Sequence, residues 1–203
     1  MQSIQLFIGI TIVAVSQAQD CRLDVHLHRD VILSLGSCLR VVGAPIEDTF
    51  VVQNKLHESG RFGLMRLDHA FKDVNKVKMT EFNVLEENLR LNDELAVTHM
   101  PSPACATALG ASQLPEGLMC VKPMDGLCAY GPGTPLFQHN RVVGLHFWED
   151  WDFASSFLCD PTVPNLFYEF TEAEMNWIED EACAMSSRCG DGAESIDELT
   201  FLT

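Results

Sequence analysis

Alternating and clustered apolar positions predict that much of this chain folds into short β-strands. Residues 23–27 read LDVHL, in which apolar and polar positions alternate as in a strand with one buried face. Apolar runs at 31–33 and 50–52 predict two further short strands. Turn-forming residues at 43–45 and 59–60 predict breaks between the strands.

The clearest helix signal lies toward the C-terminal end. Thr171 and Glu174 have the spacing of a capping box, in which each side chain accepts a hydrogen bond from the other residue's backbone. Trp177 and Ile178 follow on the predicted helix. Residues 81–104, by contrast, fit a strand or a helix, and no site is predicted there.

The N-terminal end predicts secretion. The first 19 residues contain no Asp, Glu, Lys or Arg, and residues 6–15 form a largely apolar run. Residues 16–18 read SQA, a small-x-small cleavage pattern, so we expect a signal peptide at 1–18. The apolar run is shorter than the about 20 residues that span a bilayer. We therefore expect a secreted, extracellular protein whose eight cysteines form disulfides.

The formal net charge of −16 limits the classes of partner. Nucleic acids and anionic membrane surfaces bind Lys/Arg patches, so we expect neither as a partner. The acidity serves either solubility or attraction of a cationic partner, and both readings stay open. Residues 181–203 form an acidic extension with Cys183, Cys189 and five acidic residues. We expect this extension to be loosely ordered.

The most specific motif lies at residues 128–159, which run from one cysteine to another. Within it, residues 131–133 read GPG, residues 135–137 read PLF, and residues 142–148 form an apolar run that ends in tryptophan. This order resembles the nucleophile segment of the chymotrypsin-like serine proteases. In that family a Gly-Asp-Ser-Gly-Gly-Pro loop follows the first cysteine, and a strand leads on to the second.

Other segments resemble the same family in the same order. Residues 21–38 resemble its first disulfide loop, 62–67 a strand of its N-terminal barrel, 161–168 its last strand, and 175–178 its C-terminal helix. The resemblance implies an all-β fold of two β-barrels with a C-terminal helix over residues 19–180. In the family a longer segment precedes the first cysteine, whereas here the predicted signal peptide ends just before it. We therefore expect a shortened N-terminal barrel.

The resemblance also implies a disulfide pairing. The expected pairs are Cys21 with Cys38, Cys105 with Cys120, and Cys128 with Cys159, which leaves Cys183 and Cys189 close enough to pair with each other.

At the three positions that resemble the catalytic triad, this chain carries Ser37, Arg61 and Pro132. The family has histidine, aspartate and serine there, and acyl transfer needs all three roles. Proline has no nucleophilic atom, serine is not a base near neutral pH, and arginine would repel an imidazolium. The resemblance therefore predicts a pseudoenzyme.

Further positions of the resemblance are altered. Pro132 lacks the backbone N–H that serves as one oxyanion donor in the family, and Tyr130 replaces the glycine at the other donor. Gly131 replaces the aspartate that pairs with the freed N-terminal amine. In the specificity pocket, Gly126 stands where trypsin carries an aspartate, and Glu149 replaces a wall glycine.

No metal or cofactor site is predicted. His26 and His28 could share a metal from one strand face, but no third ligand has suitable spacing. Residues 148–152 read WEDWD and form an aromatic and acidic loop, which fits either partner binding or an ordinary solvated loop.

Non-catalytic homologues of this family, which are abundant in arthropods, usually act as binding partners, cofactors or decoys. They work in extracellular protease cascades, in immunity or in reproductive fluids. The resemblance thus implies an extracellular protein partner, such as a protease or its substrate. Two alternatives stay open: an active serine-type endopeptidase with a non-standard site, such as Ser37 beside His57 or His69, and an interaction protein that works through its tail at 181–203.

Overall fold

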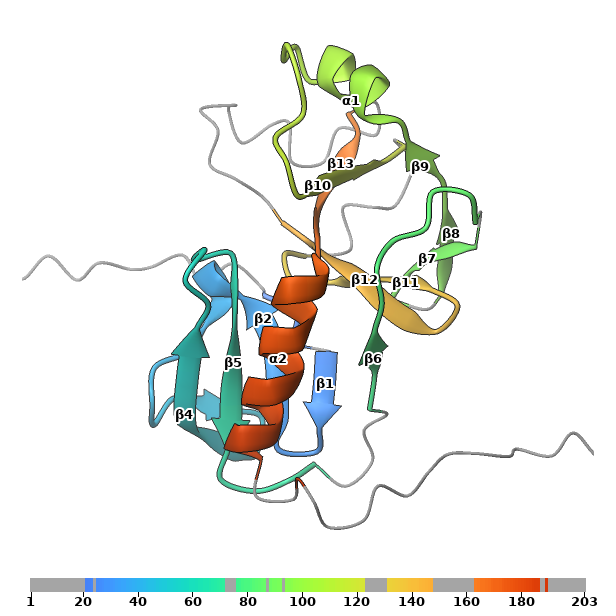
Figure 1. The fold of residues 1–203 in the computed structure, drawn as a ribbon. Helices are drawn as coiled ribbons and strands as arrows, with labels where there is room; N and C mark the ends of the chain where they lie inside the picture. The colour runs from blue at the N-terminus through green and yellow to red at the C-terminus, as the bar shows by residue number, and fades with distance from the viewer. Residues whose placement is uncertain are drawn as a thin grey trace, which may run out of the picture.

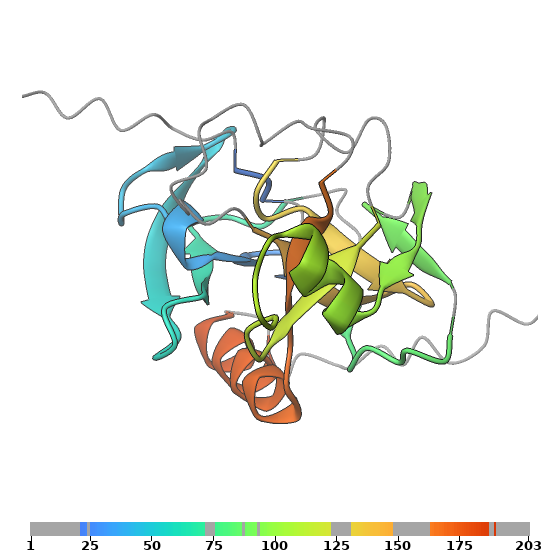
Figure 2. The ribbon, with the colours of Figure 1, turned by 90° about the horizontal axis from the view of Figure 1, so that it is seen from above.

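The computed structural model describes residues 21–23, 25–71, 76–86, 88–92, 94–122, 131–147, 163–186 and 189. These residues form two barrel-like β-sheets, one from each half of the chain, with a helix near the C-terminal end (Figure 1). Seen from above, the two sheets stand side by side (Figure 2). The predicted all-β architecture of two barrels and a C-terminal helix is confirmed.

The N-terminal sheet has five antiparallel strands in the order β1-β2-β5-β4-β3. Its elements are β1 (Val25–His28), β2 (Val31–Leu35), the 3-10 turn η1 (Gly36–Cys38), β3 (Pro45–Ile46), β4 (Thr49–Leu56) and β5 (Phe62–Leu67). The strands predicted from the apolar patterns near residues 25, 32 and 51 are therefore confirmed as β1, β2 and β4.

The C-terminal sheet has eight strands, seven of them in the order β8-β7-β11-β12-β13-β10-β9, with β6 paired in parallel to β12. Its strands are β6 (Lys78–Met79), β7 (Leu89–Leu91), β8 (Leu95–Val97), β9 (His99–Met100), β10 (Leu118–Val121), β11 (Pro135–Gln138), β12 (Arg141–His146) and β13 (Asn165–Glu169). The described residues also form two α-helices, α1 (Ser102–Ala108) and α2 (Glu172–Met185).

Both faces of the central strands β2 and β5 are buried, which explains their nearly continuous apolar sequences. On one face, Ile32 and Met65 belong to a small core within the N-terminal sheet. On the other face, Leu33 and Leu64 belong to a larger core that includes Val142 of the C-terminal sheet and three residues of α2. One continuous core therefore joins the two sheets and the helix.

The C-terminal helix α2 lies over the N-terminal sheet rather than the sheet that precedes it in sequence (Figure 1). The predicted capping box is present: Thr171 Oγ1 accepts a hydrogen bond from the Glu174 backbone N–H at 3.3 Å, and the Glu174 carboxylate accepts one from the Thr171 N–H at 2.9 Å. The expectation of a loosely ordered chain from residue 181 was wrong for the first residues. The helix continues to Met185 because Ala182 and Met185 lie on the same buried face as Ile178.

Three disulfides are present among the described residues: Cys21–Cys38, Cys105–Cys120 and Cys183–Cys189. They match three of the expected pairs, while Cys128 and Cys159 lie outside the described residues. In the described ranges, no helix combines the length and the apolar character needed to cross a membrane.

Candidate active site

Ser37 occupies the middle of the 3-10 turn η1, directly after the buried strand β2. Its neighbour Cys38 is buried and bonded to Cys21, so the disulfide fixes the turn against the start of the described chain. Ser37 itself is exposed. The turn therefore presents a single hydroxyl at the surface, where the resemblance implies an imidazole.

Arg61 lies immediately before β5 and connects the two sheets. Its carbonyl accepts a hydrogen bond from the Gly36 N–H at 2.8 Å, which ties it to the turn that carries Ser37. Its side chain reaches the opposite way: Nη2 donates to the Glu116 carbonyl at 3.3 Å, and the guanidinium lies 5.5 Å from the centre of the Tyr168 ring. An arginine over an aromatic face gains cation–π attraction, so Arg61 holds the N-terminal sheet against β13.

Pro132 is buried in the loop that leads into β11. Its carbonyl accepts a hydrogen bond from the Arg22 N–H at 2.8 Å. The adjacent Gly133 has φ +89° and donates its N–H to the His146 carbonyl at 2.7 Å. Thr134 Oγ1 donates to the Gly131 carbonyl at 2.7 Å. The loop is therefore a tight turn pinned both to its own sheet and to the N-terminal half of the chain.

The three positions that the sequence predicts as degenerate triad positions are connected by short links. Gly36, the residue before Ser37, donates its N–H to the Arg61 carbonyl. Ser37 is linked to Pro132 through the Cys21–Cys38 disulfide, because Arg22 follows Cys21 and donates to Pro132. The fold thus brings one residue from each of three distant segments to the boundary between the two sheets.

The chemistry available at this boundary follows from the three side chains. Proline offers no hydroxyl and no N–H at position 132. The Ser37 hydroxyl donates one hydrogen bond and accepts others, and the Arg61 guanidinium is a permanent cation that only donates. Hydrogen bonding, cation–π contact and anion attraction are therefore the interactions that these residues supply.

Two histidines of the N-terminal half, His28 and His57, have different surroundings. Partial burial lowers the pKa of His28, and the nearby Asp30 carboxylate opposes that effect only in part. His57 stacks on Phe62 with ring centres 4.6 Å apart, and its Nδ1 lies 2.9 Å from Ser59 Oγ. Within the described ranges, no group of three or more His, Cys, Asp or Glu side chains could hold a metal ion.

The remaining predicted positions lie outside the described residues. These are Gly126, Tyr130 and Glu149, together with the WEDWD loop at 148–152. Conversely, the structure assigns roles to Arg22 and Tyr168 that sequence reasoning did not find. Both act through contacts between segments far apart in the chain, for which a single sequence carries no local signal.

Comparisons with known proteins bear on the fold. No protein-family model matches the chain, and no curated protein matches it by sequence. Among solved structures, kallikrein-related peptidase 10 superposes with a TM-score of 0.60 at 13% identity, covering 77% of this chain and 86% of that chain. Neuropsin, a serine protease expressed in the limbic system of mouse brain, gives a TM-score of 0.56 at 16% identity, covering 79% and 89%.

A third match is an inactivated protease paralogue of the scabies mite, with a TM-score of 0.54 at 14% identity over 76% of this chain and 85% of that chain. Identities this low support a conclusion about the fold only. The similarity extends over most of the length of each compared protease. The chain therefore has the chymotrypsin-like fold of the serine proteases.

Proposed function

We propose that this protein is a secreted, catalytically inactive serine protease homologue that acts as a binding or regulatory partner of another extracellular protein. The observation that carries the proposal is Pro132. The resemblance puts Pro132 at the position of the nucleophile. The loop that carries it is hydrogen-bonded to Arg22 through the backbone, and the proline supplies neither a hydroxyl nor an N–H. Removal of one oxyanion donor alone lowers the rate of such enzymes by about 100- to 1000-fold.

The other two positions support the same conclusion. Ser37 cannot accept a proton from a nucleophile near neutral pH, and Arg61 would raise the energy of a neighbouring imidazolium. Arg61 also has another use, since its guanidinium contacts the Glu116 carbonyl and the Tyr168 ring. The residue at the aspartate position thus serves the junction between the sheets.

Secretion is supported by the predicted signal peptide and by disulfides in both halves of the chain. A protease cascade, an immune response or a reproductive fluid is the setting that the resemblance suggests. The proposal includes that the protein is an arthropod-type homologue. It also includes that the partner is a protease or a substrate of a protease.

A fluorophosphonate probe and a casein assay test the absence of catalysis. The protein, recovered from the medium of a eukaryotic secretory host, should remain unlabelled and should not cleave casein, with trypsin as the positive control. Pro132→Ser should also remain unlabelled, because Ser37 and Arg61 do not activate the new hydroxyl. Stoichiometric labelling of the unmodified protein that is lost in Ser37→Ala would instead establish an active enzyme with a non-standard site.

A further inference from the structure

The turn at residues 83–86, between β6 and β7, ends in two exposed apolar side chains. Val84 is 62% exposed and Leu85 is 87% exposed. Exposed turn tips usually carry small or polar residues, and a large aliphatic side chain in water gains nothing there. These two adjacent aliphatic side chains are therefore available to a binding partner.

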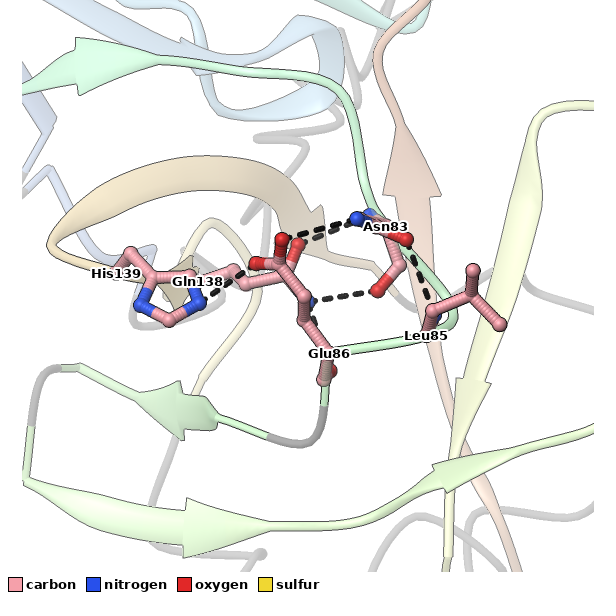
Figure 3. A network of polar contacts seen from close by, with 5 residues as sticks. All are labelled: Asn83, Leu85, Glu86, Gln138 and His139. Carbon is pink, nitrogen blue, oxygen red and sulfur yellow. Dashed lines mark hydrogen bonds and ion pairs between the residues drawn. The ribbon is translucent and has the colours of Figure 1, made fainter.

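A buried glutamine holds this turn from below. Gln138, which is 2% exposed at the end of β11, uses its whole amide on the turn (Figure 3). Its Oε1 accepts a hydrogen bond from the Asn83 N–H at 2.9 Å, and its Nε2 donates to the Asn83 and Glu86 carbonyls, each at 2.9 Å. Because three bonds fix both ends of the turn, the backbone between them has little freedom.

Side chains of the turn itself add a second set of contacts (Figure 3). Asn83 Oδ1 accepts from the Leu85 N–H at 3.0 Å, and Asn83 Nδ2 donates to the Glu86 carboxylate at 2.9 Å. The other oxygen of Glu86 lies 2.6 Å from His139 Nε2, on the β11–β12 turn. Val84 and Leu85 thus stand on a rigid base, and little conformational entropy is lost when a partner binds them.

The charge around the turn restricts the partner. Residues 81–94 contain five acidic residues and one arginine, and the whole chain carries a net charge of −16. An apolar tip within an acidic stretch of the sequence is complementary to an apolar pocket with a basic rim. Anionic membranes are repelled by this charge, and two aliphatic side chains are a small anchor for any bilayer.

We propose that Val84 and Leu85 form a docking knob that inserts into an apolar, Lys/Arg-rimmed pocket of a protein partner. The knob lies at the Gln138 end of β11, whereas Pro132 precedes the other end of this four-residue strand, which is about 13 Å long. It is therefore a second surface, and its function does not depend on whether the boundary around Pro132 is catalytic.

The test uses the full-length secreted protein with a photo-crosslinker in place of one side chain. The variant Leu85→p-benzoylphenylalanine is added to the fluid into which the protein is secreted and is irradiated there. The crosslinked adduct is identified by mass spectrometry. Val42→p-benzoylphenylalanine is the matched control, since Val41 and Val42 are a second exposed apolar pair, 74% and 62% exposed, in the N-terminal half. The crosslinked protein is then purified and titrated against variants.

We expect a discrete protein adduct at position 85 that is absent at position 42. The Kd of the purified partner should weaken more than about 10-fold with Val84→Ser/Leu85→Ser and less than about 2-fold with Val41→Ser/Val42→Ser. It should also weaken between about 50 mM and about 500 mM salt. Gln138→Ala should weaken binding through a slower association of the less ordered turn.

Three results would overturn the proposal. One is the lack of any adduct at position 85 beyond that at position 42. Another is a partner whose Kd is unchanged by the Val84→Ser/Leu85→Ser pair. The third is binding of the knob only to a second copy of this chain, detected by analytical ultracentrifugation, or only to phosphatidylcholine vesicles, detected by vesicle flotation. Fluorophosphonate labelling of the same samples reports catalysis separately.

Discussion

Replacing Gly133 by alanine tests whether the loop at Pro132 joins the two sheets. Gly133 has φ +89°, in the left-handed region that residues with a Cβ avoid. A Cβ at this position would also lie 2.5 Å from the Arg22 carbonyl oxygen, a backbone atom that cannot rotate away. The substitution should therefore push Arg22 outward and break its hydrogen bond to the Pro132 carbonyl.

The expected loss of stability has two parts. The left-handed backbone costs about 1–2 kcal/mol for a residue with a Cβ. Loss of the Arg22–Pro132 hydrogen bond adds about 0.5–1.5 kcal/mol, so Gly133→Ala should lower the free energy of unfolding by about 1.5–3.5 kcal/mol. Gly43→Ala is a matched control, because Gly43 has φ +88° and no heavy atom within 4 Å of its added Cβ. It should lose only the backbone part, about 1–2 kcal/mol.

Urea unfolding of the oxidised proteins, followed by fluorescence and circular dichroism, gives both numbers. In thermal scans each kcal/mol should correspond to about 2–4 °C for a chain of this size. Gly133→Ala should also expose the boundary between the sheets, seen as faster hydrogen exchange at the Arg22 amide. If Gly133→Ala loses no more stability than Gly43→Ala, the contact between Arg22 and the loop contributes nothing, and the reasoning fails.

Two further predictions concern the end of the chain. Thr171→Ala should lower the free energy of unfolding by about 1 kcal/mol, because the Glu174 N–H loses its acceptor. Thr171→Ser keeps the hydroxyl and should retain stability. Equal urea midpoints for the two variants would contradict this prediction. Partial burial, with a smaller contribution from Glu81, raises the pKa of Glu169 above 4.5, so the folded state binds its proton more tightly than the unfolded state does. The resulting penalty is absent below pH 4.5 and grows as pH rises through the raised pKa, so Glu169→Gln should be more stable than the unmodified protein near neutral pH and equally stable at pH 4. A constant difference at both pH values would contradict that assignment.

Much of the fold follows from local sequence signals. The alternation at β1 and the apolar runs at β2 and β4 predict strands because a strand's side chains alternate between two faces. The capping box at Thr171 predicts the start of α2 for a similar reason, since its two hydrogen bonds involve neighbouring residues only. The end of α2 was placed too early, because burial of Met185 depends on the N-terminal sheet.

Other features depend on contacts that no local pattern encodes. The sequence at residues 81–104 fits a strand or a helix and does not predict where α1 begins, although Pro103 in its first turn is well placed to begin a helix. The short strand β7 is defined by its pairing with β11, and β8 is defined by its pairing with β7. The anchoring of the 83–86 turn by Gln138 joins residues more than fifty positions apart. Sequence order placed the triad-like positions, but only the fold reveals the Arg61 contact with Tyr168.

The position of α2 has a consequence for the order in which the chain can mature. Ribosomes deliver the N-terminal half first, yet Asp30 receives a hydrogen bond from Ser186, 156 residues later, and Lys55 forms an ion pair with Glu181. The apolar face at Leu33 and Leu64 therefore stays uncovered until almost the whole chain has emerged. Oxidation of Cys21 and Cys38 needs no such wait, since both belong to the first segment. We therefore expect early disulfide formation followed by late burial, a sequence of events that exposes the nascent first sheet to chaperones during translation.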